Sequence, residues 1–225
     1  MTSTIVRGSA LALAAMLVVA CGHEAEEAPH CACQHDHEHA GLPALGPLDG
    51  ASLYQLDAAF TDQDERPFSL VSLRGEPVLV LMFYGSCTTV CPLLISEVVR
   101  VDEALSPEER ARLRVVLVTF DPDNDTPERL RALAAERSLP TPRYSLLRGD
   151  QDAVRELAMA LGVQYRRTAD GQFVHSAIVT LLDAEGRVAV QADGVDAPLE
   201  PVVARARELL AAHAEGHGAT REDER

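Results

Sequence analysis

Lysine is missing from this sequence, because all 20 basic residues among its 225 are arginine. Without lysine the chain can form no Schiff base and offers no P-loop ammonium group for a phosphate. Positive charge is also scarce, since 35 acidic residues leave a formal net charge of -15. Nucleic-acid binding needs a positive surface that neutralises phosphates. We therefore expect no nucleic-acid partner, and we interpret the acidic excess as a contribution to solubility.

The N-terminal apolar stretch, from Ala10 to Ala20, is short for a membrane-spanning helix and has the layout of a secretory leader. It ends in Val18-Val19-Ala20-Cys21, which resembles a bacterial lipobox. In that pattern residues 1–20 are removed and Cys21 receives acyl chains; a plain signal peptide or a short anchor is the alternative. Either interpretation places the domain outside the cytoplasm, where unpaired thiols tend to be oxidised. The lipobox predicts a location in the bacterial cell envelope, with a lipid anchor in a membrane and the domain facing the periplasm or the exterior.

Residues 21–50 show no apolar periodicity and are typical of a flexible tether, which Cys21 would attach to the membrane. The tether contains "HCACQHDHEH", in which thiols and imidazoles are concentrated. Such a segment can bind soft or borderline metals, although a polar linker that is rich in histidine by drift is the alternative. The accessory metal ligands predicted here are His30, Cys31, Cys33, His35, His37 and His39.

Residues 51–213 alternate between strand-like and helix-like patterns. Two continuous apolar runs, 77–84 and 114–120, predict strands that are buried on both faces. Helices are expected after each run, with further helix starts capped by Ser106 and Thr126. A helix that ends at Gly162 is expected over 150–162 and a terminal helix over 197–213. The patterns also predict a hairpin over 60–75 and a strand–turn–strand unit over 173–192. These alternating elements predict one α/β domain with a mixed sheet, without internal repeats or a second domain. The polar residues 214–225 are predicted to be a disordered tail.

Two cysteines lie four residues apart in "FYGSCTTVCPLL", directly after the first apolar run. Cys87 is expected in the turn after the strand and Cys91 in the first turn of the following helix, so their sulfurs can approach each other. The helix dipole stabilises anions at this end and favours thiolate. A thiolate is both a redox nucleophile and a soft-metal ligand. The spacing therefore leaves a disulfide switch, a metal clamp and a pair of small core residues open.

A third ligand would distinguish these alternatives, because two thiolates and an imidazole suit copper, especially Cu(I). Apart from the tether and the tail, the chain has two histidines, His175 and His213. His175 directly precedes an apolar strand in "QFVHSAIVTLL". Loops at strand ends gather where ligands bind in open α/β sheets. A single histidine at a strand start is more often structural, so only the cysteine pair makes His175 a candidate ligand.

Three blocks together, "RGEPVLVLMFYGSCTTVCPLL", "VTFDPDNDTPERL" and "VHSAIVTLLDAEGRV", resemble the Sco/SenC proteins over roughly residues 53–212. The resemblance implies a thioredoxin-like (peroxiredoxin-type) three-layer sandwich with a mixed central sheet and flanking helices. It implies that Cys87, Cys91 and His175 bind Cu(I) or Cu(II), and that the cysteines can form a disulfide. It also implies a membrane-tethered copper chaperone for cytochrome c oxidase assembly. The partner would be the copper-containing oxidase subunit or a related periplasmic copper or thiol protein.

The same resemblance bears on the "DPDNDTPE" block, where Asp121 and Asp125 are expected at the rim of the site. Simple capping of the next helix is the alternative for Asp125. The chain departs from the family pattern at Thr88, where proline is common, and at Val174, where aspartate is common. Neither departure removes a ligand.

An enzyme remains the alternative to a copper chaperone. In a thiol-disulfide reductase that keeps the copper-site cysteines of a client reduced, Cys87 would attack the client disulfide and Cys91 would resolve the mixed disulfide. Peroxidase activity is less well supported, because no arginine falls close to the cysteines in the sequence.

Overall fold

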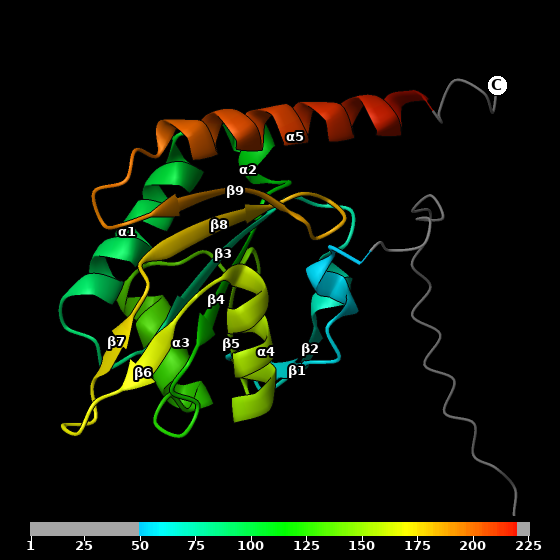
Figure 1. Cartoon of the computed structure of the whole chain (residues 1–225). Coiled ribbons are helices and arrows are strands. Elements are labelled where there is room, and N and C mark those ends of the chain that lie inside the picture. The colour runs from blue at the N-terminus through cyan, green and yellow to red at the C-terminus, as the bar shows by residue number, and fades with distance from the viewer. Residues whose placement is uncertain (1–49, 220–225) are drawn as a thin grey trace, which may run out of the picture. The chain divides into compact units, whose positions relative to one another are not determined.

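The computed structural model describes residues 50–219, and the backbone alone from 213 onward (Figure 1). The predicted leader, the lipidation residue Cys21 and the six predicted ligands of the tether lie outside the described residues.

Seven strands within the described range form one sheet, in the order β2-β1-β5-β4-β3-β8-β9 (Figure 1). β3 pairs in parallel with β4, and β4 with β5, whereas β1, β2, β8 and β9 pair antiparallel with their neighbours. The sheet is therefore mixed, as predicted. Its strands are β1 Ala59–Thr61, β2 Pro67–Ser69, β3 Val78–Phe83, β4 Arg114–Thr119, β5 Tyr144–Gly149, β8 Ile178–Leu182 and β9 Val188–Asp193.

The core lies on both faces of this sheet. Side chains of a strand alternate between the two faces, yet all six residues of β3 are buried, so helices and loops cover both sides. This confirms the predicted sandwich of a sheet between helices. α1 packs against β3, α3 and α4 pack against β5, and α5 packs against β9. The helices are α1 Val90–Glu103, α2 Pro107–Arg110, α3 Pro127–Glu136, α4 Gln151–Leu161 and α5 Glu200–Ala219, with 3-10 turns at Leu53–Gln55 and Leu70–Leu73.

Local sequence determines where several helices begin and end. Ser106 caps α2 in a reciprocal capping box with Glu109, and the Thr126 side chain caps α3. Asp150 caps α4, which ends at Gly162 in the left-handed conformation, with φ 71. These ends follow the predicted ones closely because capping depends on residues that are near in sequence.

Two elements differ from the sequence predictions. Residues 173–182 were predicted as one strand, but they form two, because Phe173–His175 (β7) pairs with Tyr165–Arg167 (β6) in a separate hairpin. Helix α5 continues to Ala219, past the predicted start of the disordered tail at 214. Alanine and glutamate directly after residue 213 favour helix and account for part of this extension. Within residues 50–219, no helix is both long and apolar enough to cross a bilayer.

Candidate metal centre

Strand directions bring three segments that are distant in the sequence to one edge of the sheet. β3 and β4 run in parallel, so the residues after Phe83 and those after Thr119 emerge at the same edge. β8 runs antiparallel to β3 with Val179 opposite Leu81, so the chain entering β8 arrives there too. The segments that follow β3 and β4 and precede β8 carry the predicted site residues. Topology therefore gathers them at a single place.

The structure brings Cys87, Cys91 and His175 together. One potential ligand atom from each residue lies within 4.8 Å of the others, and no other such group of ligands occurs in the part of the chain that the structure describes. The Cys91 Sγ is 3.5 Å from the His175 Nε2. The backbone N–H of Cys91 donates to the Cys87 Sγ at 3.4 Å. Both cysteines are free thiols here, and Cys91 is buried whereas Cys87 is half-buried.

His175 has its tautomer set by the backbone. Its Nδ1 lies 2.8 Å from the carbonyl oxygen of Ser176, which can only accept a hydrogen bond. The proton of a neutral imidazole therefore sits on Nδ1 and leaves the lone pair on Nε2, the nitrogen that faces Cys91. A carbonyl that orients a histidine in this way is the usual support of a metal-ligating imidazole.

The two thiols have opposite pKa shifts. Burial raises the pKa of Cys87, but hydrogen bonds from the N–H groups of Cys91 and Thr89 and from the Tyr84 hydroxyl outweigh it, so the pKa falls from 9.0 to about 7. Burial also raises the pKa of Cys91, and the neighbouring Cys87 raises it further. Near neutral pH Cys87 is therefore partly ionised to the thiolate, whereas Cys91 keeps its proton.

Aromatic rings surround the imidazole. The ring centroids of Phe120 and Tyr84 lie 5.0 Å and 5.9 Å from that of His175. Phe120 also contacts Phe173 at 5.0 Å and stacks on Tyr165 at 5.1 Å. Phe120, directly after β4, thereby packs against the β6–β7 hairpin and holds the ring of His175 in place beside the two cysteines. This cluster was not predicted from the sequence, because its members are scattered between residues 84 and 173.

The two aspartates predicted at the rim are buried but do not belong to the ligand group. Asp121 accepts both hydrogen bonds of the Asn124 amide, at 3.0 and 2.9 Å. Asp125 does not cap α3, because Thr126 does. Its carboxylate instead accepts hydrogen bonds from the Gly85 N–H and from the Thr119 hydroxyl.

Comparison with known proteins identifies the family. The sequence profile described as SCO1/SenC matches residues 49–211. The chain belongs to the SCO1/SenC family. A relative named SCO1 protein homolog, from Bacillus subtilis, is 26% identical over 170 residues, which cover 74% of this chain and 82% of that protein.

Solved structures of this family have the same fold as this chain. A SCO1/SenC family lipoprotein from Bacillus anthracis superposes with a TM-score of 0.63 at 24% identity, covering 72% of this chain and 99% of that one. ScoI from Bradyrhizobium japonicum, solved with copper bound, superposes with a TM-score of 0.55 at 24% identity. The superposition covers 68% of this chain and 96% of that one. These likenesses establish the thioredoxin-like fold that the family resemblance predicted.

The two departures from the Sco/SenC pattern lie outside the ligand group. Thr88 is exposed, and Val174, on β7, is 60% exposed. An aspartate next to His175 would add a negative charge that favours the imidazolium. Valine leaves the imidazole without that neighbour.

Proposed function

We propose that this SCO1/SenC protein is a membrane-tethered copper chaperone that binds copper through Cys87, Cys91 and His175. The observation that supports it most directly is the group of two sulfurs and one imidazole nitrogen within 4.8 Å. Two thiolates and one imidazole suit Cu(I) and can also take Cu(II). The copper bound in the Bradyrhizobium ScoI structure agrees with this choice of metal.

The protonation of the three groups suits stepwise loading. Cys87 is available as a thiolate near neutral pH, and the Nε2 lone pair of His175 faces the pair. Cys91 must lose its proton as copper binds, so loading releases a proton. Unloading reverses these steps when thiols or imidazoles of a partner displace the three ligands one at a time. Oxidation of Cys87 and Cys91 to a disulfide removes both thiolates, so only the reduced protein can load.

The proposed client is the copper site of a respiratory oxidase, either the copper-containing subunit of cytochrome c oxidase or a related periplasmic copper or thiol protein. We propose that acyl chains on Cys21 hold the protein to a bacterial membrane with the domain facing the periplasm or the exterior. The lipobox-like sequence supports this placement, and the Bacillus anthracis relative is described as a lipoprotein.

A second function, thiol-disulfide reduction, is favoured by the asymmetry of the cysteine pair. Cys87 is the more accessible sulfur and has the lowered pKa, whereas Cys91 is buried and protonated. That division suits an attacking thiolate and a resolving thiol. The two functions use the same cysteines but differ in what they require of His175.

The test uses residues 44–225, which form a compact unit of their own. In the reduced state this fragment is titrated with Cu(I), in competition with a Cu(I) chelator and without oxygen. We expect His175→Ala to lower the Cu(I) affinity by about ten-fold or more while disulfide reduction continues. The matched control is His213→Ala, which changes the other histidine of the predicted domain and should leave the affinity unchanged. Weak Cu(I) binding that His175→Ala does not alter, together with fast disulfide reduction, would reject the chaperone and favour the reductase.

A further inference from the structure

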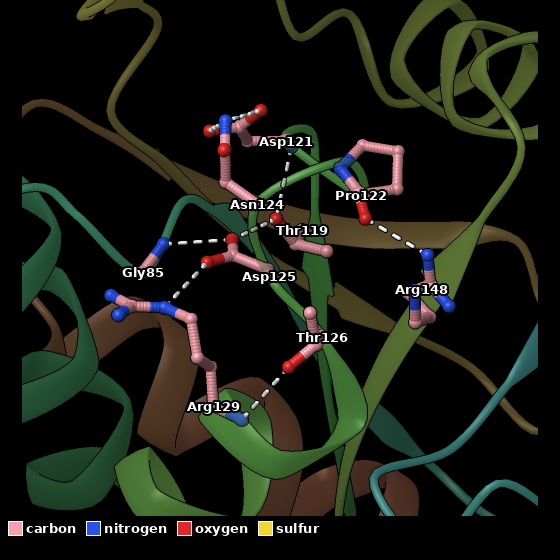
Figure 2. A network of polar contacts seen from close by, with 9 residues as sticks. All are labelled: Gly85, Thr119, Asp121, Pro122, Asn124, Asp125, Thr126, Arg129 and Arg148. Carbon is pink, nitrogen blue, oxygen red and sulfur yellow. Dashed lines mark hydrogen bonds and ion pairs between the residues drawn. The ribbon is translucent and has the colours of Figure 1, made fainter.

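Asp125 connects the loop after β4 with the turn after β3. The residue is 1% exposed, and its Oδ2 accepts the backbone N–H of Gly85 at 2.8 Å (Figure 2). The same oxygen accepts the Thr119 hydroxyl at the end of β4, while Oδ1 lies 3.9 Å from the Nε of Arg129 on α3. A buried carboxylate with these partners is held in one position, because moving it would leave its charge unpaired.

The loop that carries Asp125 is itself anchored on its other side. The Arg148 guanidinium, on β5, donates to the carbonyl of Pro122 at 2.9 Å, and Thr126 caps α3 directly after the loop (Figure 2). The backbone N–H of Asp121 also donates to the Thr119 hydroxyl at 3.0 Å. Asp125 therefore fixes the position of Gly85 relative to the sheet.

The turn that receives this contact carries Cys87. Tyr84, Gly85 and Ser86 connect the end of β3 to Cys87, whose own N–H donates to the Tyr84 carbonyl at 3.3 Å. Among the hydrogen bonds found in the described residues, the Asp125 carboxylate is the only side chain outside this turn that accepts an N–H from Gly85, Ser86 or Cys87. The placement of the Cys87 sulfur thus depends on Asp125, which lies 40 positions after Gly85 in the chain.

Gly85 fits this contact closely. A Cβ built on Gly85 would collide with the Asp125 carboxylate, with its Oδ1 as the nearest atom. Gly85 does not have a positive φ, so the requirement for glycine comes from the close approach of the carboxylate and not from backbone conformation. Replacing Gly85 by alanine would therefore push the turn and the carboxylate apart.

From these contacts we infer that Asp125 is a positioning residue for the metal centre, which fixes the Cys87 turn so that its sulfur meets Cys91 and His175. It acts through Gly85 and not as a ligand, since the ligand group consists of the two cysteines and the histidine. The inference rests on the proposed copper site and adds a residue on which the geometry of that site depends.

The experiment compares Asp125→Ala, Asp125→Asn and Gly85→Ala in residues 44–225. We expect Asp125→Ala and Gly85→Ala each to lower the Cu(I) affinity by about ten-fold or more, as loss of a group that orients a metal ligand does. Asp125→Asn keeps an oxygen that can accept from Gly85 and should recover most of the affinity. Because both defects break the same contact, the double variant Gly85→Ala/Asp125→Ala should lose no more than the worse single variant.

A second readout does not depend on copper. The midpoint of Cys87–Cys91 oxidation in a glutathione redox buffer should shift in Asp125→Ala and return towards the wild type in Asp125→Asn. The stability control is Asp102→Asn, which weakens a buried ion-pair cluster with Arg110 and Arg143 in the last turn of α1, at the opposite end from Cys91. It should lower the thermal midpoint without changing the Cu(I) affinity or the redox midpoint.

The outcomes separate the two proposals. If the wild type binds no Cu(I), the proposed function fails, and the redox midpoints still decide the role of Asp125. A folded Asp125→Ala variant with the wild-type Cu(I) affinity and redox midpoint would overturn the inference. An Asp125→Asn variant whose Cu(I) affinity is no higher than that of Asp125→Ala would also overturn it. If Asp125→Ala does not fold, Gly85→Ala replaces it, and wild-type affinity in Gly85→Ala would overturn the inference.

Discussion

The lowered pKa of Cys87 predicts a specific pattern of thiol reactivity. The test protein is residues 44–225 with Cys91→Ser, in which Cys87 is the sole thiol, because the other three cysteines precede residue 44. The N–H groups of residue 91 and Thr89, which donate to the Cys87 sulfur, remain in this variant. The reaction is attack on a small neutral aromatic disulfide that releases a coloured thiolate, so its rate reports the reactivity of Cys87 directly.

The expected magnitude follows from the two pKa values. With a pKa of about 7, roughly half of Cys87 is thiolate at pH 7, whereas a thiol at its ordinary value of 9.0 is about one per cent thiolate. A thiolate with a pKa lower by about two units is also about eight-fold less nucleophilic, for a Brønsted slope near 0.45. The folded protein should therefore react about six-fold faster than the urea-unfolded protein at pH 7, but about seven-fold slower at pH 10.

The assay is the second-order rate constant measured from pH 5 to pH 10 in buffer and in urea. Partial burial of Cys87 lowers the rate at every pH, so the midpoint of the profile is the decisive quantity. We expect that midpoint near pH 7 in the folded protein and close to the ordinary value in urea. Equal midpoints in the two conditions would refute the reasoning, and so would a Cys87→Ser variant whose remaining Cys91 reacts readily at pH 7, because the pKa of Cys91 is raised.

Three further predictions concern other parts of the molecule. Phe120→Ala should lower the free energy of unfolding by about 3–5 kcal/mol in urea, because the ring is fully buried beside His175; a loss below about 1 kcal/mol would contradict this packing. Ser106→Ala removes the side-chain cap of α2 and should cost about 1 kcal/mol by the same measurement, with an unchanged stability as the contrary result. Deleting residues 30–39 from the full chain should reduce the copper bound per molecule at saturation while leaving the tightest site intact, and an unchanged stoichiometry would exclude the tether as a ligand source.

The sequence predicted those parts of the fold that depend on local or strongly periodic patterns. β3 and β4 were evident as continuous apolar runs, and the starts of α2 and α3 were evident from Ser106 and Thr126. The β6–β7 hairpin was missed because each strand has only three residues and little alternation. The Asp170-Gly171 pair between these strands is a common turn sequence and could have indicated the hairpin.

The ligand residues of the candidate site could be predicted from the sequence, but the residues that hold these ligands in position could not. The spacing of Cys87 and Cys91 placed two sulfurs together and made His175 a candidate third ligand, which the family resemblance then supported. The tautomer of His175 depends on the direction of one backbone carbonyl, and the environment of its ring depends on Phe120, a residue far away in sequence. The "DPDNDTPE" block drew attention to Asp125, but its partner is a backbone N–H, which any residue other than proline could offer.

The three ligands lie on or next to secondary-structure elements that differ greatly in stability. Cys87 and Cys91 follow β3, an interior strand of the seven-stranded sheet, whereas His175 lies on a two-stranded hairpin that shares no strand with that sheet. Such a small hairpin has little stability of its own, so its opening should cost far less than opening the central strands. We expect native-state hydrogen exchange to show faster exchange in β6 and β7 than in β3. A cargo metal would then have two fixed ligands and one that the chain can withdraw at low cost, which is a useful asymmetry for a protein that must release what it binds.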